Sequence, residues 1–116
     1  MENRHVNVLG LRYEIQFRKY GTDKALEDSD GYCDHTLKLI VVQEGPDDPN
    51  SPRNLGNDVV YMKQVLRHEI VHAFHLESGL QGSFTPIGTG IPESIVDWFA
   101  IMGPRIYQAW KEADAL

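Results

Sequence analysis

The segment VLRHEIVHAFHLESGL, residues 65–80, constrains the fold of this chain more than any other stretch. At about 100° per residue, a helix through it has one broad apolar face. His68, His72 and His75 lie together on roughly the opposite face. Burying so many ionisable groups is costly unless something binds them. The apolar face comprises Val59, Met62, Leu66, Ile70, Ala73 and Phe74.

This helix should begin at Asn57 or Asp58, which can cap it, and end near Ser78, before a terminating Gly79. Because little of its circumference is polar, we expect it to be buried between a sheet and a later helix. The later helix should start after Pro92 with ESIVDWFAIM, be kinked or interrupted at Gly103-Pro104, and continue through RIYQAWKEA.

Two stretches before the helix predict strands. Residues 11–18, LRYEIQFR, alternate apolar and polar side chains. HVNVLG before them can form a short partner strand, with Gly10 at a turn or a bulge. Residues 32–42, YCDHTLKLIVV, predict a second clear strand that is strongest from 37 to 42, and residues 43–57 a long loop. The expected fold is α+β, a single domain over residues 1–116. In it, a small antiparallel or mixed sheet packs on the central helix, and a second long helix follows.

Composition excludes several classes of protein. The net charge of -6 disfavours a nucleic-acid partner, since the phosphate backbone attracts basic proteins. A lone cysteine, Cys33, rules out a disulfide within the chain, and we interpret it as a small strand residue. No apolar run approaches the roughly 20 residues of a membrane span, and the N-terminus has no apolar signal region. We therefore expect a cytoplasmic protein without a membrane partner.

Residues 68–72, His-Glu-Ile-Val-His, form an HExxH motif inside the predicted helix. Residues four apart lie about 40° from each other and one turn along the axis, so both imidazoles can reach one ion. Glu69 lies about 100° from His68, which keeps it off the metal but able to hold the attacking water. The pattern predicts a Zn²⁺ site with His68 and His72 as ligands and Glu69 as the catalytic base.

A catalytic zinc ion needs a third protein ligand. His75 shares the face of His72 but lies further along the same helix, so we interpret it as part of the pocket wall. The later helix offers Glu93 and Asp97, two carboxylates on one face. If the two helices are antiparallel, Glu93 reaches the open side of the histidines as the third ligand. Asp97 would then accept the outer N–H of a ligand histidine.

These residues resemble the gluzincin group of zinc peptidases, the thermolysin-like class, in which HExxH on one helix is joined by the Glu of an ExxxD segment on a following helix. Residues 31–101 are also similar to small phage and prophage proteins regarded as minimal zinc peptidases. The longer metzincin pattern needs glycine at position 75 and histidine at position 78, where this chain has His75 and Ser78. Larger gluzincins carry an oxyanion-stabilising Tyr or His on extra lobes. The candidates for that role in this chain are Tyr61, Tyr107, His35 and Arg105.

The resemblance implies a minimal zincin-like metallopeptidase that hydrolyses peptide or protein substrates through a zinc-activated water. The alternative is a zinc-binding interaction or regulatory module without turnover, which a fourth protein ligand such as His75 would favour. For the enzyme, we expect the substrate to pair with residues 36–42 as an exposed edge strand. The Gly-rich loop 81–91, which joins the two ligand helices, would be the far wall of the cleft.

Overall fold

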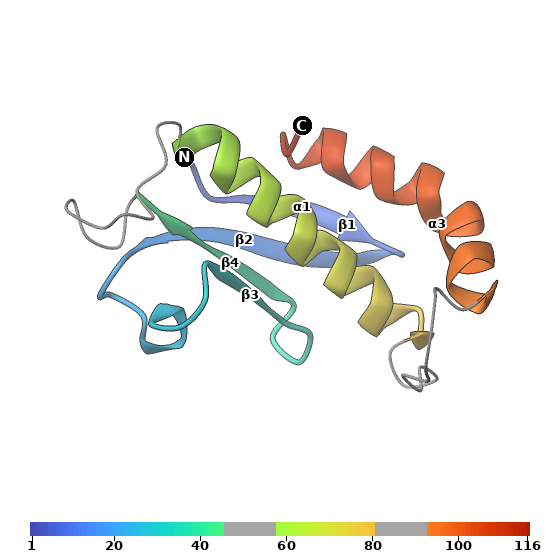
Figure 1. The fold of residues 1–116 in the computed structure, drawn as a ribbon, viewed down its shortest axis with the longest axis horizontal. Helices are drawn as coiled ribbons and strands as arrows, with labels where there is room; N and C mark the ends of the chain where they lie inside the picture. Colours follow the sequence, from blue (N-terminus) through green and yellow to red (C-terminus); the bar gives the residue numbers. More distant parts are fainter. Residues whose placement is uncertain (46–57, 81–92) are drawn as a thin grey trace.

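The structure is a computed structural model that describes residues 1–45, 58–80 and 93–116. Within these residues the chain forms a mixed sheet of strand order β1-β2-β4-β3 and two long helices (Figure 1). The pair β2 and β4 is parallel, whereas the two outer pairs are antiparallel. The α+β class is confirmed. The elements are β1 (Arg4–Val8), β2 (Leu11–Lys19), the 3-10 turn η1 (Lys24–Leu26), β3 (Gly31–Asp34), β4 (Leu39–Glu44), α1 (Asp58–Glu77) and α3 (Glu93–Glu112).

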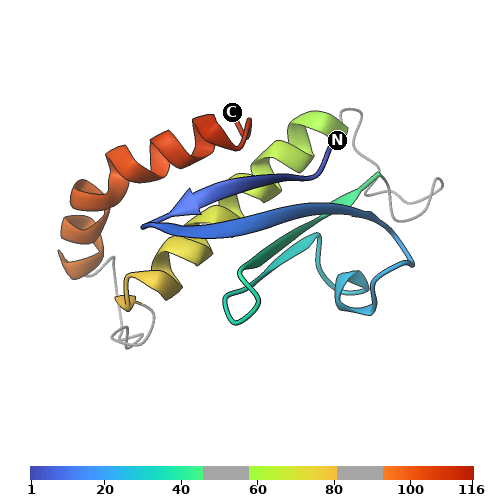
Figure 2. The same cartoon turned by 180° about the vertical axis from the view of Figure 1, so that it is seen from behind.

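Both helices lie on the same face of the sheet (Figures 1 and 2). Helix α1 crosses β4 and β3, and α3 lies beside α1 along β1. The expectation that α1 is sandwiched between the sheet and the second helix is therefore wrong, and His68 on its outer side is exposed. Val59 also faces solvent, with 52% of its surface exposed. The core side chains include Val6, Tyr13, Ile15, Ile40, Val42, Leu66, Ile70, Phe74 and Ile106.

The stretch 32–42 is two strands rather than one. β3 ends at Asp34, whose carboxylate accepts hydrogen bonds from the backbone N–H groups of Thr36 (3.0 Å) and Leu37 (3.2 Å). Lys38 then adopts a left-handed backbone with φ of 53° before β4 begins. This side-chain cap turns the chain into an antiparallel hairpin. β4 therefore lies in the middle of the sheet between β2 and β3, which overturns the prediction that 36–42 is the edge strand.

Other local predictions are confirmed. β1 and β2 are joined by a tight turn at Leu9 and Gly10, both with positive φ, as a two-residue hairpin loop requires. Gly79, with φ of 79°, follows the end of α1. Helix α3 runs unbroken through Pro104, which has no backbone N–H to donate, and its axis bends along its length (Figures 1 and 2). None of the described helices has the length and apolarity needed to cross a membrane.

A buried clamp holds the last turn of α1 on the sheet. The Glu77 carboxylate accepts hydrogen bonds from the hydroxyl of Tyr13 on β2 and from the ammonium of Lys38, each at 2.5 Å. Tyr13 is fully buried, and the Glu77 side chain is only 11% exposed. Burial by itself would raise the pKa of Glu77, but the hydrogen bonds from Lys38 and Tyr13 outweigh it and lower the pKa. The carboxylate thus joins α1, β2 and the β3–β4 turn.

We expect Glu77→Gln to lower the free energy of unfolding at pH 7 by about 2 kcal/mol, the scale of hydrogen bonds to a charged group. Because the folded-state pKa of Glu77 is lowered, its stabilisation is present above the usual glutamate value of about 4.3 and is lost as the pH falls below it. Denaturant unfolding between pH 7 and pH 3 should therefore show a flatter pH dependence in the variant.

The matched control is Glu112→Gln, at an exposed position of α3. This substitution should change neither the free energy of unfolding at pH 7 nor the dependence of that free energy on pH. If Glu77→Gln and the wild type lose stability in parallel on acidification, the clamp does not act through its charge.

Candidate metal centre

His68 and His72 meet on the outer side of α1. They lie one turn apart, and their Nε2 atoms are 3.0 Å from each other. Their ring centroids are 4.7 Å apart, with the ring planes at 70°. Two nitrogens bound tetrahedrally to one zinc ion at about 2.0–2.1 Å would be about 3.3 Å apart. The spacing of the two imidazole nitrogens is therefore close to that required for a shared metal ion.

Glu69 lies beneath this pair. Its side chain is 5% exposed, and the potential ligand atoms of His68, Glu69 and His72 all lie within 4.8 Å of one another. Burial raises the pKa of Glu69, against the opposing effect of His68. Burial, together with His68 and His75, lowers the pKa of His72. A neutral imidazole is the form that binds metal, and a buried carboxylate of raised pKa is suited to proton transfer.

Strand β3 packs directly against the HExxH helix at Gly31. A Cβ atom there would lie 2.8 Å from Cγ1 of Val65, 2.9 Å from the carbonyl oxygen of Val41 and 3.4 Å from Cγ of Glu69. No other residue type fits in this space without moving the strand or the helix. Because β3 pairs only with β4 among the described residues, Gly31 brings the free edge of the sheet beside Glu69.

Cys33 faces the same helix two residues further along β3 and packs partly against the core. Burial, followed by the negative charge of Glu69, raises the pKa of its thiol to about 12. The thiol is therefore protonated at neutral pH and is a poor nucleophile or metal ligand. This agrees with the interpretation of Cys33 as a strand residue.

His75 turns away from the cluster toward the second helix. Its ring centroid is 6.2 Å from that of His72 but 4.7 Å from that of Trp98 on α3. The indole N–H of Trp98 donates a hydrogen bond of 3.1 Å to the hydroxyl of Ser78, at the end of α1. The first turns of α3 are thereby docked on the last turns of α1.

The predicted third ligand and its neighbour are only partly located. Glu93 and Asp97 belong to the first turns of α3, but their side chains lie outside the described residues. Their roles as zinc ligand and hydrogen-bond acceptor therefore stay predictions. The loop 81–91, predicted as a far wall, also lies outside the described residues.

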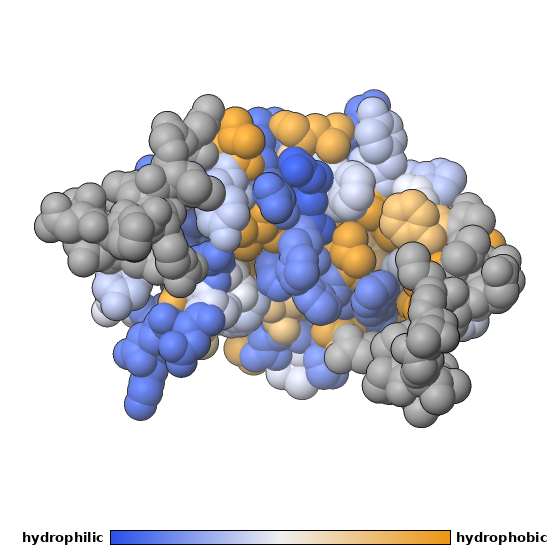
Figure 3. All heavy atoms as spheres, in the orientation of Figure 1, coloured by the Kyte–Doolittle hydropathy of each residue, from blue (hydrophilic) through white to orange (hydrophobic). Residues whose placement is uncertain are grey.

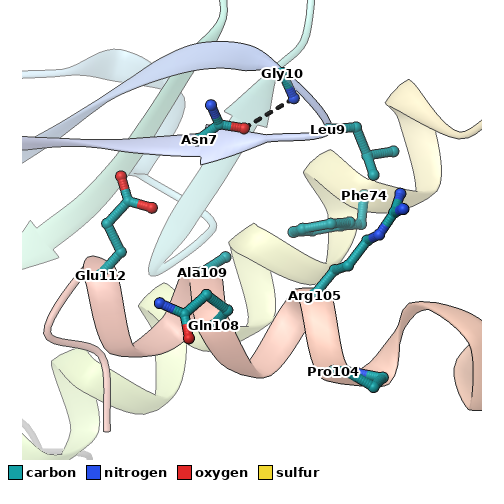
Figure 4. A pocket seen from close by; sticks show the side chains of 9 residues that line it. All are labelled: Asn7, Leu9, Gly10, Phe74, Pro104, Arg105, Gln108, Ala109 and Glu112. Atoms are coloured by element: carbon teal, nitrogen blue, oxygen red, sulfur yellow. Dashed lines mark hydrogen bonds between the residues drawn. The ribbon is translucent and has the colours of Figure 1, made fainter.

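The four oxyanion candidates are in different places. Tyr61 is on α1, two turns before His68, and donates a hydrogen bond to Asp30. Arg105 lines a hollow of about 640 Å³ between α3 and the β1–β2 turn, at the sheet edge opposite β3, where it extends toward that turn (Figure 4). Tyr107 is exposed on α3, and His35 lies in the β3–β4 turn. Of the four, only Tyr61 is on the metal-binding helix.

Two features of the site were not predicted. For the steric role of Gly31, the sequence offers only a weak signal, which is a glycine at the start of a strand. The residues that Gly31 packs against, Val65 and Glu69, are distant from it in sequence. The contact of His75 with Trp98 had no sequence signal, because it depends on how α3 returns to α1.

Comparisons of the chain with protein families, with curated proteins and with solved structures found no match.

Figure 3 shows the face of the molecule that carries α1, where hydrophilic side chains cover the middle and hydrophobic ones gather around them. A hydrophilic middle bordered by hydrophobic side chains agrees with the burial pattern of α1, in which His68 is exposed and the neighbouring Glu69 is buried. Within the described residues, His68 is exposed on this side of α1.

We expect Gly31→Ala to force β3 away from α1 and to lower the free energy of unfolding by about 1–3 kcal/mol, the usual cost of overpacking. Denaturant unfolding monitored by circular dichroism measures this. The control is Gly103→Ala in α3, where a Cβ would meet Phe99 at an ordinary 3.8 Å. That change should alter the free energy of unfolding by less than about 1 kcal/mol, because the preference of alanine for helix offsets its crowding with the following Pro104 ring. Equal effects of the two substitutions would contradict the tight packing at Gly31.

Proposed function

We propose that this protein is a minimal zinc-dependent endopeptidase. His68, His72 and Glu93 would hold Zn²⁺, Asp97 would orient a ligand histidine, and Glu69 would be the general base. The observation that carries the proposal is the pair of imidazole nitrogens 3.0 Å apart with a buried carboxylate beside them. A group of this composition and spacing fits a divalent metal ion.

The residues of the chain divide the reaction between them. When bound, zinc supplies Lewis-acid chemistry, which activates the attacking water and polarises the scissile carbonyl. Glu69 takes a proton from the water as its oxygen attacks the carbonyl carbon. Glu69 then gives this proton to the nitrogen as the C–N bond breaks, which yields a carboxylic acid and an amine. The raised pKa of Glu69 suits a group that must hold the proton between these two steps.

The strand order of the sheet suggests where an extended substrate would bind. β3, rather than residues 36–42, is the edge next to α1, and its outward backbone groups can pair with an extended peptide. The close contact at Gly31 places this edge beside Glu69. A peptide added to β3 would therefore run along the HExxH helix with a carbonyl near the two histidines.

A non-catalytic zinc module would be favoured by a closed set of four protein ligands. His75 is the candidate for the fourth ligand, but its ring lies against Trp98, and it does not belong to the group that includes His68 and His72. At a purely structural site the buried Glu69 would have a role only as a ligand, whereas a catalytic site also needs a base. Both observations support the enzyme over the module.

Purified protein should bind about one zinc ion per chain, and EDTA should lower its melting temperature, because a ligand of the folded state alone stabilises that state. Metal analysis and thermal scans measure this. His72→Ala should abolish zinc binding, whereas His5→Ala, at an exposed histidine on β1, should leave it unchanged. A wild-type melting curve that does not respond to zinc would overturn the proposal.

Glu69→Gln should keep zinc and reduce peptide hydrolysis by about 10²–10⁴-fold, because the amide cannot accept the proton. Cleavage of an unfolded protein substrate, followed by mass spectrometry, provides the measurement. If Glu69→Gln also empties the zinc site, Glu69 is a ligand rather than the base. If the zinc-loaded wild type cleaves no member of a diverse peptide library, the non-catalytic module is the better interpretation.

A further inference from the structure

Four aromatic rings form a continuous series from the metal site to the second helix. The ring planes of His68 and His72 meet at 70°, those of His72 and His75 at 87°, and those of His75 and Trp98 at 65°. Each contact is therefore edge to face, an arrangement that favours one ring orientation over others. The series passes from α1 to α3 at its last step.

The far end of the series is anchored. Trp98 donates its indole N–H to the Ser78 hydroxyl at 3.1 Å, and the same hydroxyl lies 3.4 Å from the carbonyl oxygen of His75. Ser78 is itself held by the hydrogen bond from its backbone N–H to the carbonyl oxygen of Phe74 at 3.0 Å. The indole ring is thus fixed to the end of α1, so that the neighbouring His75 packs against a stationary surface.

The anchored Trp98 and His75 rings can affect the metal site through the orientation of the His72 ring. Its Nε2 must face His68 for the two imidazoles to share an ion, and a histidine side chain can rotate about two bonds. The His75 ring lies at nearly a right angle to the His72 ring, with the two centroids 6.2 Å apart. A His75 ring held in this position by its contact with Trp98 would limit the rotation of His72 away from His68.

We propose that Trp98 is a positioning residue of the metal site. Acting through His75, it holds the His72 imidazole toward His68, so that docking of α3 on α1 and metal binding stabilise each other. The inference rests on the proposed zinc site. Because such coupling is reciprocal, zinc should also tighten the docking of α3, and the Trp98 indole should sense zinc.

Zinc affinity of the full chain, measured by competition with a chromogenic chelator, tests the coupling. Ser78→Ala removes the acceptor of the indole N–H, and Trp98→Leu removes the ring. Each should weaken zinc binding by about 10-fold, as loss of a group that orients a metal ligand does. Trp98→Phe, which restores a ring beside His75, should recover part of the affinity. The control is Trp110→Phe on the same helix, which should bind zinc as the wild type does.

A second readout uses fluorescence. The chain has two tryptophans, so in the Trp110→Phe background Trp98 is the single indole. Zinc should change its emission and saturate at the same concentration as the chelator assay. Ser78→Ala in this background should reduce that change. Circular dichroism of each metal-free variant checks folding, and if Trp98→Leu does not fold, Ser78→Ala and Trp98→Phe carry the test.

The outcomes separate this inference from the proposed function. If the wild type binds no zinc, both are overturned. If it binds zinc and the Ser78 and Trp98 variants bind it equally well, the metal site stands and the positioning role is wrong. A loss of stability in the metal-free Trp98 variants without a loss of zinc affinity also overturns the positioning role, because it shows that Trp98 is purely structural.

Discussion

The backbone of β3 can lie against α1 because Gly31 has no side chain, and the arrangement of the site depends on this contact. With β3 so close, Glu69 is enclosed between helix and strand. The rotation of α1 that buries Glu69 also turns His68 outward to solvent. At the other end of the helix, the clamp of Tyr13 and Lys38 on Glu77 fixes its position on the sheet. The two contacts together determine where the histidines lie.

Burying a carboxylate that has few hydrogen-bond donors lowers the stability of the folded state. Burial raises the pKa of Glu69, which shows that its environment disfavours the charge. Glu77, also largely buried, has a lowered pKa because two donors satisfy it. The same helix thus carries one glutamate that stabilises the fold and another whose environment is suited to proton transfer. Groups that cost stability are common where chemistry takes place.

Local features of the sequence predicted much of the structure. Alternation identified β2, helical spacing identified α1, and the i, i+4 relation brought His68 and His72 together without any knowledge of the fold. The division of 32–42 into two strands was missed, because the side-chain cap at Asp34 has no signature in hydrophobic periodicity. Strand order and the placement of α3 beside α1 depend on contacts between distant segments. For the same reason, the sequence did not predict the contact between His75 and Trp98.

Among the described residues β3 pairs with β4 alone, and this has a consequence for association between copies of the chain. An unpaired strand edge is a template on which another molecule can form an extended sheet and aggregate. β3 spans Gly31–Asp34, so a second copy would gain only a few backbone hydrogen bonds there. Asp30 and Asp34 bound the strand, and the chain carries a net charge of -6, so two copies that approached edge to edge would repel each other. The brevity and acidity of β3 thus disfavour self-assembly along this edge.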